Sequence, residues 1–109
     1  MSDLDFTRQY RTPHSEGYLL SLRGDELGRV DLHYGFESIF ATLVLVREVR
    51  ESQILNLIEE IDERIALSAE STRDDFCVTV YQGREIGFYT DDYLAEHRRR
   101  ERGEANGQE

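Results

Sequence analysis

The stretch from Ser38 to Arg47 constrains the fold most strongly, because it is apolar on both faces of an extended strand. Alternate positions place Ile39, Ala41, Leu43 and Leu45 on one face, and Phe40, Val44 and Val46 on the other. Strands with two apolar faces lie inside a sheet and are covered from both sides. The sequence therefore predicts a central strand that needs two covering layers.

The next segment supplies one of those layers. From Gln53 to about Ala69 the apolar residues follow helical spacing and occupy one arc: Ile54, Leu57, Ile58, Ile61 and Ile65. Acidic residues occupy the opposite arc: Glu59, Glu60 and Glu63. Ser52 is the expected N-cap. We expect one amphipathic helix that buries its isoleucine stripe on a sheet.

Four further strands are indicated by alternating apolar residues: Gly17–Arg23, Glu26–Tyr34, Phe76–Tyr81 and Glu85–Thr90. The last two read as a hairpin closed by a tight turn at 82–84. Asp91 and Asp92 are suited to cap a short final helix that ends near Arg102. The expected fold is α+β, with one main helix on one face of a mostly antiparallel five-stranded sheet in the order β-β-β-α-β-β, followed by the short helix.

The length of 109 residues favours a single domain. We divide the chain into an N-terminal arm at 1–16, an α+β domain at 17–94, and an Arg/Glu-rich helix end with a frayed tail at 95–109. Leu4, Phe6 and Tyr10 share one parity, so the arm is either an edge strand or an unpaired extension. Pro13 marks the junction with the domain.

Composition removes several functions. The chain has 13 basic residues, all of them arginine, so it has neither a Schiff-base lysine nor the lysine of a P-loop. The formal net charge of -10 argues against a broad nucleic-acid interface. The single cysteine, Cys77, excludes an internal disulfide, and no close pair exists among His14, His33, His97 and Cys77. We therefore expect no metal and no cofactor.

No apolar run in the sequence is longer than four residues, so no membrane span is predicted. The first residues are acidic and do not resemble a secretory signal. The expected location is the cytoplasm.

One helix cannot cover both faces of the expected sheet, and a soluble monomer rarely leaves a large apolar patch open. A second copy of the chain is the most economical cover, with Leu43, Val44, Tyr81 and Tyr89 as candidate interface residues. The alternative is a monomer whose terminal segments fold over the second face. The main hypothesis is a non-catalytic homodimeric protein-interaction domain, a small acidic adaptor or chaperone-like protein. In element order, size and acidity the chain resembles type III secretion chaperones, and this resemblance implies a homodimer that holds unfolded segments.

Two other functions stay open. A pocket around Asp31, His33, Cys77 and Tyr81 would make the chain a small-molecule-binding domain or a small enzyme, with a Cys-His pair as its reactive group. The structural alternative is an exposed His33 and a core Cys77. The arginines of the run 97–102 are suited to contact single-stranded RNA or phosphate, or simply to stabilise the end of a helix.

Overall fold

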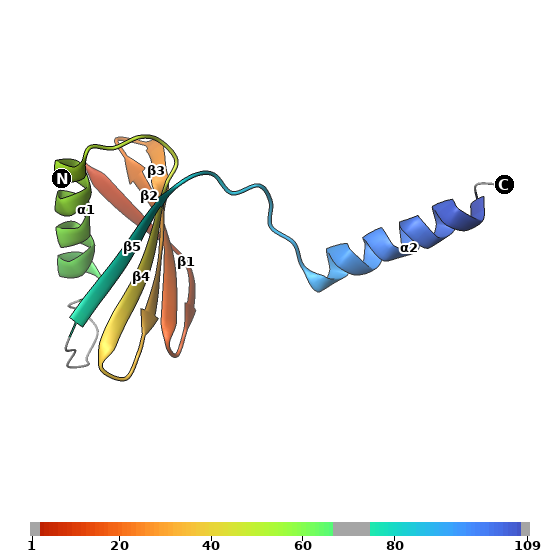
Figure 1. Ribbon diagram of the computed structural model, residues 1–109, viewed down its shortest axis with the longest axis horizontal. Coiled ribbons are helices and arrows are strands. Elements are labelled where there is room, and N and C mark those ends of the chain that lie inside the picture. The colour runs from red at the N-terminus through yellow and green to blue at the C-terminus, as the bar shows by residue number, and fades with distance from the viewer. Residues whose placement is uncertain (1–2, 67–74, 108–109) are drawn as a thin grey trace.

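The computed structural model describes residues 3–66 and 75–107, with side chains described up to residue 103. The elements in chain order are β1 (Leu4–Thr12), β2 (Ser15–Leu22), β3 (Asp25–Tyr34), β4 (Ser38–Leu45), α1 (Glu51–Arg64), β5 (Asp75–Gln82) and α2 (Asp91–Gly107) (Figure 1). The five strands form one sheet in the order β1-β2-β3-β4-β5. Strands β1 to β4 pair antiparallel with their neighbours, and β5 pairs parallel with β4.

The α+β class and the five strands agree with expectation, but the order and pairing do not. The observed order is β-β-β-β-α-β-α and the sheet is mixed rather than mostly antiparallel. The arm supplies β1, and the expected strand at Glu85–Thr90 is not a strand. β5 returns to the sheet after the crossover through α1, and such a connection places the second strand parallel to the first.

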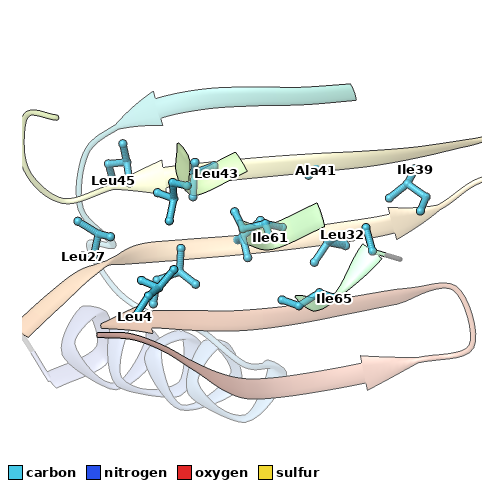
Figure 2. Close-up of a cluster of buried hydrophobic side chains, with 13 residues drawn as sticks. Leu4, Leu27, Leu32, Ile39, Ala41, Leu43, Leu45, Ile61 and Ile65 are labelled. Carbon is cyan, nitrogen blue, oxygen red and sulfur yellow. The ribbon is translucent and has the colours of Figure 1, made fainter. Parts of the chain in front are cut away.

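The core lies between α1 and one face of the sheet (Figures 1 and 2). The helix contributes Leu57 and Ile61, each 1% exposed. Arg50 is the residue that precedes the helix, not Ser52, and its backbone N–H donates to Oε1 of Gln53 at 3.3 Å. The helix ends at Arg64, earlier than expected, and the last predicted helical residues, 67–69, lie outside the described part.

A shift in the pairing of β1 with β2 changes the face that β1 presents. Leu4 and Phe6 face α1, but the register slips by one residue between Arg8 and Tyr10. A one-residue slip moves the following side chains to the other side of a sheet. The shared face predicted for Leu4, Phe6 and Tyr10 is therefore wrong for Tyr10.

A buried carboxylate ties together the first three strands on the α1 side. Glu16 is 5% exposed and accepts hydrogen bonds from the hydroxyls of Tyr18 at 2.6 Å and Tyr34 at 2.5 Å. Arg8 and Arg11 of β1 form ion pairs with it at 3.5 and 3.4 Å. Burial alone would raise the pKa of Glu16, but the tyrosine hydrogen bonds and the arginines outweigh burial and lower that pKa.

The helix α2 stands away from the sheet at the end of an extended segment, 83–90 (Figure 1). Thr90 caps the helix, in place of the expected Asp91 or Asp92, since its Oγ1 accepts the N–H of Tyr93 at 3.3 Å. The helix continues to Gly107 and so includes residues that we expected to be a frayed tail. Within the described residues, neither helix has the length and apolar character that a membrane crossing needs.

Candidate functional site

We call the sheet face opposite α1 the reverse face. Most residues of the two predicted sites lie on this face; the exceptions are Leu43, which faces α1, and Tyr89, which is not on a strand. Strand pairing aligns its residues in three rows from β2 to β5. The rows are Leu19–Arg29–Val44–Tyr81, Gly17–Asp31–Thr42–Thr79 and Ser15–His33–Phe40–Cys77. The reverse face divides into a polar half on β1 to β3 and an apolar half on β4 and β5.

The polar half is held by a network around Asp31. The Tyr10 hydroxyl donates to Oδ1 of Asp31 at 2.7 Å, and the Arg29 guanidinium donates to the same oxygen at 3.1 Å. The ring of Tyr10 lies over Gly17, where an added Cβ would be 2.0 Å from a ring carbon. Burial, together with the bond to Asp31, raises the pKa of Tyr10 to about 12. Both hydrogen bonds go to Asp31, so its carboxylate is occupied by Tyr10 and Arg29.

The segment 83–90 touches this polar half at one point. Glu85 forms an ion pair with Arg29 at 3.6 Å. Together with Gln9, Tyr10 and Phe88 the pair lines an open hollow of about 460 Å³. The apolar side chains of the segment nevertheless point to solvent, since Ile86 is 96% exposed and Phe88 82%. The segment therefore covers a corner of the reverse face and leaves its own apolar groups uncovered.

The apolar half lies on β4 and β5 and has two exposed aromatic rings. Phe40 is 53% exposed and Tyr81 is 57% exposed. The other residues of this half carry no formal charge at neutral pH: Thr42, Val44, Cys77 and Thr79. Two acids border this half on the same face: Asp75, at the first position of β5, and Asp31, directly beside Thr42 in its row. Gly35 lies against the ring of Phe40, where an added Cβ would be 3.6 Å from a ring carbon, but more than half of Phe40 stays exposed.

The residues of the predicted pocket share the reverse face but do not converge. Phe40 lies between His33 and Cys77 in their row, so these two residues are two strand spacings apart, about 10 Å. Burial and the neighbouring Asp75 raise the pKa of the Cys77 thiol, which favours the neutral form. The arrangement does not place a base beside a nucleophile.

The candidate interface residues fall in three places. Val44 and Tyr81 lie on the reverse face. Leu43 is 0% exposed and packs in the core on the α1 side, so its assignment to the second face is wrong. Tyr89 lies in the segment 83–90 and meets Tyr93 edge to face at 5.3 Å. A strand that is apolar on both sides does not reveal which side meets the helix.

Sequence reasoning left several exposed apolar residues out of its candidate sites, among them Phe36, Phe40, Ile86 and Phe88. Phe40 lies on the same face of its strand as Val44, so the alternation alone was sufficient to add it to the candidate interface. Ile86 and Phe88 were assigned to a strand that does not form.

The basic run on α2 is partly neutralised by its own helix. Glu96 pairs with both Arg99 and Arg100, and Glu101 lies 3.8 Å from Nε2 of His97. No group of three potential metal ligands occurs among residues 3–66 and 75–107. Neither a phosphate-binding cluster nor a metal centre is therefore supported by the contacts of these residues.

No protein-family model, curated protein or solved structure matches this chain. The resemblance to type III secretion chaperones depends on an element order that the structure corrects to β-β-β-β-α-β-α. The proposals below therefore rest on the geometry of the chain itself.

Proposed function

We propose that the chain is a non-catalytic homodimeric protein-interaction domain, in which a second copy covers the apolar half of the reverse face. The observation that carries this proposal is the exposure of Phe40 and Tyr81 on the side of the sheet that α1 does not reach. Exposed aromatic side chains on an uncovered sheet face are typical of a protein contact.

The terminal segments of the same chain do not cover the apolar half, and α2 stands away from the sheet (Figure 1). The N-terminal residues form β1 and extend the sheet sideways. The segment 83–90 meets the reverse face through Glu85 and Arg29, on the polar half. A second chain is then the cover that serves Phe40 and Tyr81 and the exposed Ile86 and Phe88 together.

Charge favours a second copy at this place over any other on the surface. With a net charge of -10, two copies repel over most of their surfaces. The residues from Phe40 to Val44 and from Phe76 to Gln82 contain no acid and no base. In a twofold interface the same patch of each copy faces itself, so an uncharged patch lets two copies meet without placing like charges in contact.

Light scattering during size-exclusion chromatography tests the proposal. At micromolar concentration the mass should be twice the 12.7 kDa of one chain. Replacing both rings, with Phe40→Ser and Tyr81→Ser, should raise the dissociation constant about tenfold or more, a change of roughly 1.4 kcal/mol or greater.

Leu55→Ser is the matched control, because Leu55 is also an exposed apolar residue, at 55%, but lies on α1. It should leave the mass unchanged. A wild-type mass of one chain at all concentrations contradicts the proposal, and so does a dimer that tolerates the double substitution. A chain that is monomeric alone and forms a complex only with a different protein would also overturn the homodimer, because the surface would then bind a foreign partner.

A further inference from the structure

β5 has one side paired with β4 and an outer side that is open, and its hydrogen bonds to β4 show which backbone groups point to each side. β5 ends the sheet, and no described strand pairs with its outer side. The N–H of Gly83 donates to the carbonyl of Leu45 on β4 at 2.8 Å. Because successive residues of a strand point their backbone groups to opposite sides, Thr79 and Tyr81 also bond toward β4. Val78 and Val80 therefore direct their N–H and C=O groups outward.

Beyond its first position, where Oδ1 of Asp75 accepts the N–H of Phe76 at 2.8 Å, this edge lacks the features that usually prevent pairing with another chain. Soluble proteins protect edge strands with charges, prolines or bulges. From Phe76 to Gln82, β5 has no charged residue and no proline, and its register with β4 is continuous. β-branched residues at Val78, Thr79 and Val80 favour a strand partner.

The core at this edge is also incomplete. On the neighbouring strand β4, Ile39, Ala41 and Leu43 are at most 3% exposed. On β5, Phe76, Val78 and Val80 face the same core but are only partly buried. Figure 2 shows the buried cluster, which contains no residue of β5. A further strand beside β5 would shield these three side chains.

We propose that β5 pairs antiparallel with β5 of a second copy, with the twofold axis at Thr79, to make a continuous ten-stranded sheet. This inference rests on the proposed homodimer and specifies how its two chains join. Val78 of each copy stands opposite Val80 of the other, and these two residues exchange the backbone hydrogen bonds that point outward. Both copies of α1 then lie on the same side of the joint sheet.

The charges favour this register over the one centred on Val80. With Thr79 opposite Thr79, Cys77 stands opposite Tyr81 and Asp75 opposite Gly83, so no like charges face each other. A shift of two residues that centres the pairing on Val80 would place Asp75 opposite Glu85. Like charges directly opposite destabilise a strand pair.

The same register brings the C-terminal segment of one copy to the other copy. Gly83 of one chain leaves the joint sheet beside Asp75 of the other, which pairs with Ser38 in the row next to that of Phe40 and Cys77. For this segment to cover the apolar half of the other copy, the ion pair of its Glu85 with Arg29 must open and Phe88 must leave the hollow that it lines with Tyr10 of its own chain. Edge pairing thus explains how the second chain reaches a face that its own sheet does not touch.

A charge exchange at the axis tests the pairing. Thr79 is exposed and faces itself, so Thr79→Glu and Thr79→Lys should each raise the dissociation constant about tenfold or more. An equal mixture of the two variants should recover the mass of two chains, because each mixed pair joins opposite charges. The matched control is Thr7→Glu with Thr7→Lys, since Thr7 is an exposed threonine on the reverse face of the other edge strand, β1. Neither Thr7 variant should change the mass.

A disulfide distinguishes edge pairing from two sheets packed face to face. In a Cys77→Ser background, Thr79→Cys should form an intermolecular disulfide under mild oxidation, because opposed residues of this type have Cα atoms about 4.5 Å apart. Face-to-face sheets lie about 10 Å apart, too far for that bond. Thr7→Cys in the same background should not cross-link.

The outcomes separate the two proposals. A wild-type dimer whose mass ignores Thr79→Glu, and which forms no disulfide at Thr79→Cys, overturns edge pairing and leaves the homodimer standing. A wild-type monomer overturns both. A charge-exchange rescue without the disulfide also contradicts edge pairing, because it points to facing sheets.

Discussion

The two edges of the sheet differ in how they meet solvent. The β1 edge has charged residues at Asp5, Arg8 and Arg11 and a register shift within the strand. α1 also closes it, since Nη1 of Arg64 donates to the carbonyl of Leu4 at 2.9 Å and the guanidinium lies 4.5 Å from the ring centre of Phe6. From Phe76 to Gln82 the β5 edge has none of these features. The contrast indicates that β1 is an edge strand protected against further pairing, whereas β5 is an edge strand that can pair with a partner.

The largest expected effect comes from proline at two adjacent positions of β5. Thr79→Pro removes an N–H that bonds to β4, so it should destabilise the fold by roughly 2–3 kcal/mol. Val80→Pro removes an N–H that points outward. It should retain the fold but abolish the dimer. Urea unfolding and light scattering measure the two effects. If Val80→Pro remains dimeric and folded, the outer edge of β5 is not the contact.

On the β1 side, Glu16→Gln should destabilise the monomer by about 2–3 kcal/mol, because the buried side chain loses its charge between two tyrosines and two arginines. Urea unfolding measures this loss. Glu37→Gln, at an exposed position, is the control and should change stability by less than about 0.5 kcal/mol. Equal effects of the two substitutions would show that the Glu16 network does not hold β1.

The same carboxylate predicts a dependence on acid. The pKa of Glu16 lies below its ordinary value of 4.5 in the folded chain. A lowered pKa gives stability that is fully present above 4.5 and is lost as the pH falls through the folded value. The stability difference between the wild type and Glu16→Gln should therefore be constant near neutral pH and shrink in acid. Thermal unfolding across that range measures it, and a difference that grows in acid would contradict the sign.

The smallest effect concerns the polar half of the reverse face. Tyr10→Phe removes one hydrogen bond to Asp31, which keeps its bond from Arg29. The expected loss is about 1 kcal/mol by urea unfolding, with no change in dimer mass. Tyr89→Phe, in the exposed segment, is the control. A dimer that weakens with Tyr10→Phe would place the polar half inside the interface.

Several elements could be predicted because their patterns are local. The isoleucine stripe indicated α1, and alternation indicated β2, β3, β4 and β5. The prediction of a hairpin after β5 was wrong, because the alternation near Ile86 and Phe88 indicates a tendency to be extended but not a neighbouring strand to pair with. The turn at 82–84 also lacks the Asn-Gly or Asp-Gly pair that favours a tight hairpin.

The candidate site could be predicted only in part, since it depends on pairing between distant strands. Asp31, His33, Cys77 and Tyr81 of the predicted pocket lie on one face, but only strand order shows that Phe40 separates His33 from Cys77. The identity of β5 as an edge also requires strand order. A slip of one residue in β1 moved Tyr10 to the reverse face, and no local pattern announces such a slip.

Amide hydrogen exchange at single-residue resolution tests the central claim most directly, because it compares the two edges in the unmodified protein. At a concentration where the chain is dimeric, the amides of Val78 and Val80 should exchange as slowly as those of Thr79 and Tyr81, and their protection should fall on dilution. The amide of Phe6 on the β1 edge should show no such dependence on concentration. Fast exchange at Val78 and Val80 in the concentrated protein would contradict a joined β5 edge.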